Sequence, residues 1–254
     1  MHMGFRLIVV VWMLCSGAEA RLYAQRPSVA EQYLFQAANA ERAQRGLPTL
    51  HWDTALYRAA HAHAQEMASR ASISHQYAGE AELAERGKSA GAKFSLIAEN
   101  VAEAPTAVRI HDAWMNSPGH RANLLDPHVD AVGISVLQRD GQLYAVQDFE
   151  RTVATLSLEA QEQAVGQLVA AAGPVSILPS SDDARRTCAL STGYAGARQP
   201  WFVMRYTSGD LMQIPDVLKA KIATGKFREA VVGACPAPGH QPFSSYSIAV
   251  LLYP

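Results

Sequence analysis

The pattern of apolar residues changes near residue 152, and this change restricts the folds that the chain can adopt. Before it, apolar residues recur at helical spacing, whereas after Gly173-Pro174 the chain consists of short β-rich runs broken by Gly, Pro and Ser. A chain of 254 residues with 49% hydrophobic residues can form one large core or two small ones. We therefore expect an α/β domain over residues 29–151, a connecting helix within 152–173, and a small β-rich domain of unknown role over 174–254.

The first unit carries clear signals for individual elements. Residues 29–45 and 54–70 are predicted helices, and Asp53 is placed to cap the second one. The segment "AVGISVLQRDGQLYAVQDFE" predicts a hairpin, because two β-rich runs flank an Asp140-Gly141 turn signal.

The second unit is predicted mainly as strands. The segment "LSLEAQEQAVGQLVAAAG" is a predicted helix that ends at Gly173, and "PDVLKAKIATG" is predicted as a helix or an exposed arm. Strands are expected in four segments, which are "RTCALSTGY", "PWFVMRYTS", "REAVVGACP" and "YSIAVLLYP".

The N-terminal residues resemble a secretory signal peptide over residues 1–20. Arg6 precedes an apolar run that is too short to span a bilayer, and Ala18-Glu19-Ala20 provides a small-x-small cleavage site. Two alternatives remain open: acylation of Cys15 and an uncleaved N-terminal anchor. We expect a secreted protein, extracellular or periplasmic, with no transmembrane span in the mature chain.

Two cysteines remain after such a cleavage, Cys188 and Cys235. An even count in an exported chain favours a disulfide between them, and two buried thiols are the alternative.

The charge balance argues against nucleic acid as a partner, since the net charge is −1 and Lys and Arg form no cluster beyond short pairs. We therefore expect no nucleic-acid binding.

Three residues between positions 72 and 125 could carry chemistry: His75, Glu99 and His120. Each has an ordinary interpretation when taken alone. His75 could be a histidine of a surface loop, Glu99 a solvated strand end, and His120 a residue projected by the Pro118-Gly119 turn. The three become informative only as a set.

The chain resembles the CAP superfamily, which includes cysteine-rich secretory proteins, antigen 5 and plant pathogenesis-related proteins. It is most similar to the bacterial SCP-like extracellular branch. The resemblance runs from about Leu34 to Phe149 and rests on the order and spacing of "NAERAQRGLPTLHWDTAL", "AAHAHAQEMA", "SH", "AEN", "AWMNSPGHRANLL" and "VGISV". It implies an α–β–α sandwich in which His75, Glu99 and His120 line one cleft. Many relatives carry a second acid three residues after Trp114, where this chain has Ser117.

Several kinds of chemistry are compatible with this cleft. His75 and His120 could hold Zn²⁺ or another divalent metal, with Glu99 as a third ligand. A hydrolase would use Glu99 or His120 as the general base toward water, and Ser117 is a weaker nucleophile candidate because a Ser in such a turn often caps the backbone.

We favour a secreted, non-enzymatic module that binds a small molecule, a lipid or cell-wall material. The family is linked to such ligands, and motifs alone do not establish turnover. The alternatives are a metal-assisted hydrolase acting on peptide or cell-wall material and a structural or adhesive extracellular protein.

Overall fold

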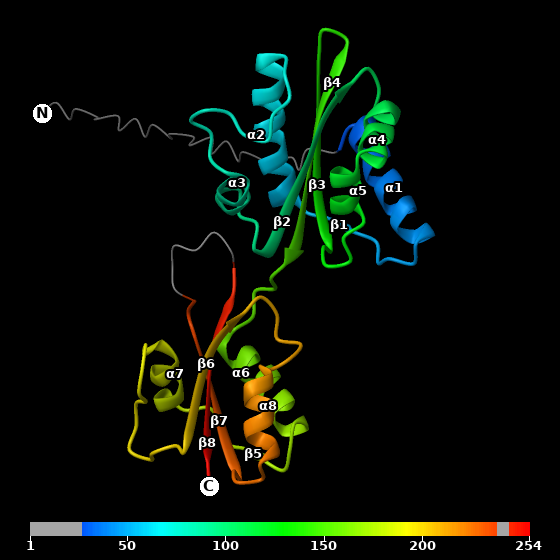
Figure 1. Ribbon diagram of the computed structural model, residues 1–254. Helices are drawn as coiled ribbons and strands as arrows, with labels where there is room; N and C mark the ends of the chain where they lie inside the picture. Colours follow the sequence, from blue (N-terminus) through cyan, green and yellow to red (C-terminus); the bar gives the residue numbers. More distant parts are fainter. Residues whose placement is uncertain (1–26, 238–243) are drawn as a thin grey trace, which may run out of the picture.

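The computed structural model describes residues 27–237 and 244–254, which form two units that follow one another along the chain (Figure 1). The proposed signal peptide and Cys15 lie outside the described residues. Across the described ranges, none of the helices has both the length and the apolar character needed to cross a bilayer.

The first unit is an α–β–α sandwich around a mixed sheet with the strand order β1-β3-β4-β2. Its elements are α1 (Val29–Gln44), β1 (His51–Trp52), α2 (Thr54–Arg70), α3 (Leu83–Ser89), β2 (Phe94–Ala104), α4 (Ala107–Asn116), α5 (Pro118–Leu124), β3 (Ala131–Arg139) and β4 (Gln142–Thr152). As predicted, Asp53 caps α2, and its side chain accepts a 2.7 Å hydrogen bond from the Leu56 N–H.

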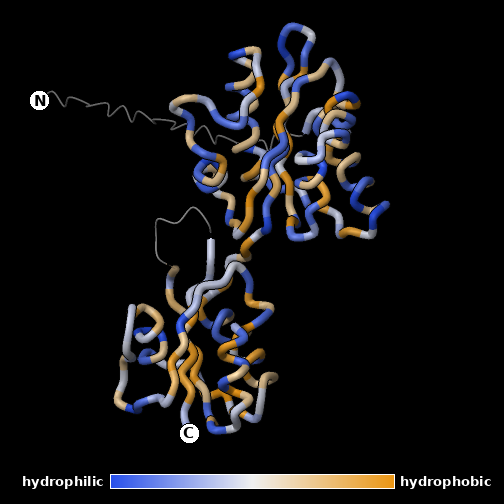
Figure 2. The backbone as a smooth tube through the Cα atoms, viewed as in Figure 1, coloured by the Kyte–Doolittle hydropathy of each residue, from blue (hydrophilic) through white to orange (hydrophobic). Residues whose placement is uncertain are grey.

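Two helical layers cover this sheet (Figure 1). Helices α1, α4 and α5 contribute Leu34, Trp114 and Leu124 to the core on one face. On the other face, α2 packs Ala64 and Met67 against β2 and β4. The apolar residues lie along the strands and between the layers, and polar residues cover the outside (Figure 2). The predicted sandwich is confirmed.

Backbone geometry explains the tight turn between β3 and β4 and the close packing of α2 on the sheet. The predicted β3–β4 hairpin is present, and Asp140 and Gly141 both have positive φ, at 50° and 80°, as a two-residue turn of this kind requires. Gly133 in β3 lies directly under α2, where a Cβ would come within 2.1 Å of the Tyr57 nitrogen. Only glycine therefore allows α2 to lie this close to the sheet.

The second unit is built on another mixed sheet, with the strand order β5-β7-β8-β6. Its elements are α6 (Leu158–Ala171), β5 (Ser176–Ile177), α7 (Asp182–Ala189), β6 (Phe202–Ser208), α8 (Asp216–Ala223), β7 (Glu229–Cys235) and β8 (Tyr246–Tyr253). Helix α7 lies against one face of the sheet, and α6 and α8 share a core with strand residues on the other.

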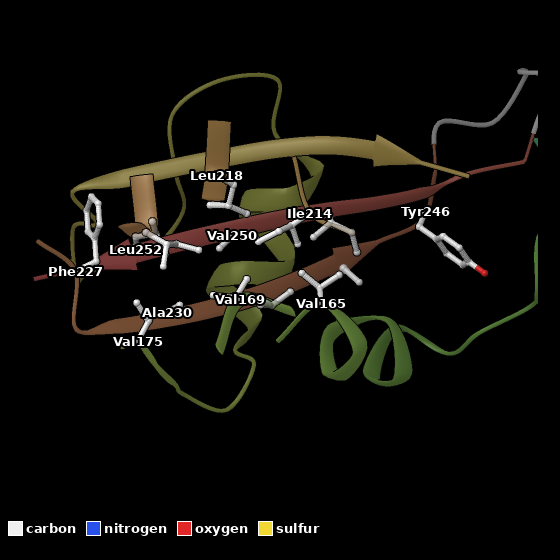
Figure 3. Packing of buried hydrophobic residues seen from close by; sticks show 14 of the residues in the cluster. Val165, Val169, Val175, Ile214, Leu218, Phe227, Ala230, Tyr246, Val250 and Leu252 are labelled. Atoms are coloured by element: carbon white, nitrogen blue, oxygen red, sulfur yellow. The ribbon is translucent and has the colours of Figure 1, made fainter. Parts of the chain in front are cut away.

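The helix expected to connect the two units is part of the second one. Val165 and Val169 of α6 are fully buried and pack with Leu218, Val250 and Leu252 of that unit (Figure 3). The apolar face of α6 therefore has a partner within the second unit, and the connection is reduced to the short segment that precedes the helix.

A second correction concerns the segment "RTCALSTGY", which begins inside α7 rather than forming a strand. Ser181 caps this helix through a hydrogen bond from the Ala184 N–H, and two Asp residues occupy its first turn. These features stabilise a helix start more strongly than the β-branched residues favour a strand. The end of α7 carries Cys188, which forms the predicted disulfide with Cys235 at the end of β7.

The two units meet through the chain itself and a few polar contacts. Arg151 Nη2 lies 2.5 Å from the Asp210 carboxylate, and the Ser244 N–H donates to the Phe94 carbonyl at 2.7 Å. The Tyr246 hydroxyl donates to the carbonyl of Ala154, in the connecting segment, at 2.6 Å.

Candidate binding cleft

The residues singled out in the sequence lie around one cleft of about 690 Å³ in the first unit. His75, Glu99, Ser117 and His120 all line it, together with Gln76, Glu82, Leu83, Ala84, Ile97, Gly119 and Asn123. The cleft therefore combines polar side chains on one part of its wall with apolar ones on another.

The position of β2 at the edge of the sheet brings these residues together. Glu99 lies in β2, His75 in the loop between α2 and α3, and His120 in α5. His75 Nδ1 is 2.9 Å from Glu99 Oε1, and the His75 and His120 rings are 6.5 Å apart between centroids. Beside an edge strand, groups from the two helical layers can face the same space.

Two asparagines fix α5 against β2. The Asn100 side-chain amide donates to the His120 carbonyl at 3.0 Å. Asn123 donates to the Glu99 carbonyl at 3.2 Å and to the Asn100 side-chain oxygen at 3.0 Å. These bonds hold the backbone of His120 and of Glu99 in one arrangement.

Arg86 of α3 connects the loop that carries His75 with the side chain of Glu99 in β2. Its Nη2 donates to Glu99 Oε2 at 2.5 Å, and its Nη1 donates to the carbonyl of His75 at 3.2 Å. The Glu99 carboxylate is only 3% exposed, and both of its oxygens are engaged, one by Arg86 and one by His75. The Glu99 carboxyl is therefore held in one orientation by contacts at both oxygens.

His63 is a fully buried residue of α2, and its contacts support the cleft. Its Nδ1 is 2.6 Å from Glu80 Oε1, and its Nε2 is 2.7 Å from the Ser74 carbonyl. Both ring nitrogens therefore lie within hydrogen-bond distance of an oxygen atom, which fixes the orientation of the ring. The Ser74 bond ties the loop that presents His75.

Asp148 of β4 lies beside Glu99 as its cross-strand partner. It is fully buried, and neither of its oxygens has a hydrogen-bond partner among the described residues. Burial, followed by the charge of Glu99, raises the pKa of the Asp148 carboxyl well above its usual value. Burial beside Glu99 therefore favours the protonated form of the Asp148 carboxyl.

The pKa values of the two cleft histidines are shifted in opposite directions. The hydrogen bond to Glu99 raises the pKa of His75, whose side chain is 62% exposed. Burial, and then the proximity of His75, lower the pKa of His120. The cleft thus presents a ring that tends to carry a proton beside a ring that tends to remain neutral.

The donor set fits a metal ion poorly. Within residues 27–237 and 244–254, no group of three or more His, Cys, Asp or Glu side chains is arranged to hold one. The third ligand that the sequence offers, Glu99, is already bound by Arg86. Ser117 lines the cleft at the junction of α4 and α5, and its side chain does not cap α5.

Arg86, Glu80 and Asp148 were not identified from the sequence. Arg86 and Glu80 lie in segments where charged residues are common, so nothing in the local pattern marks them as buried. Asp148 had a detectable signal, because "VQDFE" places three polar residues in a strand that is otherwise apolar. Polar residues in such a strand are buried together with partners or with a perturbed pKa.

Comparisons with known proteins place this site in a family context. Residues 35–149 match the family model "CAP: Cysteine-rich secretory protein family". The Bacillus subtilis protein YkwD is 32% identical over 112 residues, which cover 44% of this chain and 44% of YkwD. The Bacillus subtilis membrane protein YlbC is 28% identical over 113 residues, which cover 43% of this chain and 32% of YlbC. The match thus spans less than half the length of either curated relative.

Two solved structures are similar to the first unit. An extracellular protein with an SCP domain from Bacillus anthracis is 29% identical, with a TM-score of 0.45, over 48% of this chain and 40% of that chain. An outer surface protein from Borrelia burgdorferi is 24% identical, with a TM-score of 0.46, over 48% of this chain and 92% of that chain.

Proposed function

Residues 35–149 form a domain of the cysteine-rich secretory protein (CAP) family, and from this premise we propose that the protein is an exported binding module. Its cleft holds a small amphiphile, whose polar group lies between His75 and His120. The observation that carries this proposal is that the Glu99 carboxyl already contacts Arg86 and His75.

Glu99 is poorly suited to catalysis or metal binding. A general base needs a free oxygen within reach of the proton it removes, and a metal ligand needs a free lone pair directed at the ion. Arg86 and His75 each contact one oxygen of Glu99, and withdrawing Glu99 would leave the buried Arg86 guanidinium with only the more distant Glu80 carboxylate, at 3.8 Å. The carboxylate is thus better suited to orienting His75 than to reacting.

The lining of the cleft indicates the ligand class. His75 can donate a hydrogen bond or carry a positive charge, and neutral His120 can accept or donate one. Leu83, Ala84 and Ile97 supply an apolar wall beside these rings. A molecule with a polar or anionic head and a short apolar body matches both parts of the lining.

Decanoate, below its micelle concentration, is a suitable probe, and ¹H–¹³C NMR of the methyl and imidazole groups is a suitable readout. We expect decanoate to shift the signals of His75, His120 and Ile97. Leu83→Asp and the double variant His75→Ala/His120→Ala should both weaken binding, and the exposed His128→Ala variant should not. Binding unaffected by all three changes, or no binding at all, would rule out an amphiphile site and favour a structural or adhesive role.

Metal binding and hydrolysis are tested in parallel. Zinc titration by calorimetry should show at most weak binding, because no group of three His, Cys, Asp or Glu side chains among the described residues is arranged to hold an ion. Micromolar zinc binding that is lost in the double histidine variant would instead establish a metal site. Turnover of casein or peptidoglycan that is abolished by Glu99→Gln would replace the binding proposal with a hydrolase.

Export is part of this proposal and rests on the sequence of residues 1–20 and on the disulfide. A disulfide that contributes to stability requires an oxidising compartment to form. N-terminal sequencing of protein recovered from outside the cytoplasm should show a start at Arg21, and a chain that keeps residues 1–20 would indicate an uncleaved anchor.

A further inference from the structure

Strand β6 forms an open edge of the second sheet. Among the described residues it pairs only with β8, and Figure 3 shows it outermost beside β8 and β7. Every residue of β8 is buried, whereas no residue from Phe202 to Ser208 in β6 is. One side of β6 therefore presents backbone groups that no other described strand covers.

This edge lacks the features that normally block pairing with another strand. Edge strands are usually protected by Pro, by bulges, or by charged side chains that point outward. The seven residues of β6 contain no Pro and pair with β8 in unbroken register. The charged residue of the strand, Arg205, turns its side chain toward α7, where Nε donates to the Thr187 carbonyl at 2.6 Å.

Two hollows have residues of β6 in their lining, and the larger one also extends over residues of β7 and β8. The hollow on the α7 side has a volume of about 690 Å³ and is lined by Arg205, Thr207 and Ser247, among others. The second hollow has about 260 Å³ and is lined by Ser208, Ile214 and others on the α8 side. Tyr206 and Thr207 contribute to both.

We propose that β6 binds an extended peptide segment of a partner protein as an added strand. Adjacent residues of a strand point to opposite faces, so alternate side chains of the added peptide would enter the two hollows. Two large apolar side chains near the ends of β6, Trp201 and Met212, are 66% and 80% exposed. They provide further contact area for such a peptide.

The charge of Arg205 selects the occupant. Its guanidinium binds the carbonyls of Thr187 and Gly193 and no carboxylate of the described residues, and it is the charged group in the lining of the α7-side hollow. An acidic side chain directed into this hollow would pair with it. A second copy of this chain fits less well, because an antiparallel pair centred on β6 would place Arg205 opposite Arg205.

The test uses the whole protein and two peptides, Ac-Val-Thr-Val-Glu-Val-Thr-Val-NH2 and the same sequence with Lys at the centre. Calorimetry should show that the Glu peptide binds about tenfold more tightly than the Lys peptide. Arg205→Glu should reverse this preference, and Arg205→Lys should retain it. Arg228→Glu is the control, because Arg228 is an exposed residue of the same unit outside both hollows.

Amide hydrogen exchange shows where the peptide binds. We expect the Glu peptide to protect alternate amides between Phe202 and Ser208, since β8 already covers the others. The proposal is overturned if neither peptide protects β6 or if Arg205→Glu leaves the preference unchanged. A concentration-dependent dimer in sedimentation, with β6 protected in the absence of peptide, would also overturn it and assign the edge to a second copy.

Discussion

The Arg86 guanidinium and the Glu99 carboxylate lie 2.5 Å apart, with only 6% and 3% of their side chains exposed. Both groups are almost completely shielded from water, so the contact between them replaces much of the hydration that each group loses on folding. The same pair fixes Glu99 under His75, which means that the packing of the first unit and the geometry of the cleft share one interaction.

We predict that Arg86→Met destabilises the first unit by about 3–5 kcal/mol, because it removes the guanidinium that donates to the buried Glu99 carboxylate. Urea unfolding followed by Trp fluorescence measures this change. The double variant Arg86→Met/Glu99→Leu should be more stable than Arg86→Met alone. Arg109→Met, at an exposed position, should change stability by less than about 0.5 kcal/mol. A cost below about 1 kcal/mol for Arg86→Met would show that the pair is not essential to the fold.

We predict that Glu99→Gln lowers the pKa of His75, because the hydrogen bond from Glu99 is the main cause of its rise. The interaction stabilises the fold fully at pH values below the unfolded pKa of His75, and its contribution is lost as the pH rises through the higher folded value. NMR titration of the imidazole carbons measures both histidines in one experiment. His128, which lies outside the cleft beside Asp126, serves as the internal control, and an unchanged His75 titration would contradict the prediction.

We predict that stability falls with rising pH through Glu150. Burial raises the pKa of this carboxyl to about 8, so the folded chain keeps a proton that the unfolded chain releases near pH 4.5. The resulting loss of stability accumulates between these two values and amounts to at most about 5 kcal/mol.

Glu150→Gln should remove this dependence, so the variant should gain stability relative to the parent between pH 6 and pH 9. Free energies of unfolding at the two pH values give the comparison, with the exposed Glu66→Gln variant as the control. A parallel response of parent and Glu150→Gln would show that Glu150 is already ionised at pH 6.

We predict that Cys188→Ala/Cys235→Ala destabilises the second unit by about 4 kcal/mol, because the disulfide closes a long loop between α7 and β7. Hydrogen exchange resolved by mass spectrometry should show faster opening of β7 and β8, with β2–β4 of the first unit unchanged. Equal acceleration in both units would indicate that the two unfold together.

The sequence predicted the parts of the fold that depend on local chemistry. Asp140-Gly141 predicted the hairpin because few other residue pairs readily adopt positive φ at both positions of a two-residue turn. Asp53 predicted the start of α2. The motif residues His75, Glu99 and His120 line one cleft in the structure. These signals act over a few residues or recur in a fixed order.

Long-range relationships could not be predicted in the same way. Arg86 pairs with Glu99 across thirteen positions and two different elements, and no local pattern distinguishes it from a solvent-exposed arginine. The segment around Cys188 was assigned to a strand from its residue types, although Ser181 and the following Asp pair indicated a helix start. Helix α6 looked like a connector because its apolar face has a partner only in the folded second unit.

The double role of Arg86, which binds the His75 carbonyl and the Glu99 carboxylate together, has a consequence for genetics. A cell that makes an Arg86 variant would contain less of the protein, because a few kcal/mol of lost stability increases the share removed by proteases. A screen for loss of function would therefore recover Arg86 substitutions as low-abundance alleles. Substitutions of His120, whose side chain is partly exposed in the cleft, would instead be recovered as normally abundant protein that fails to bind.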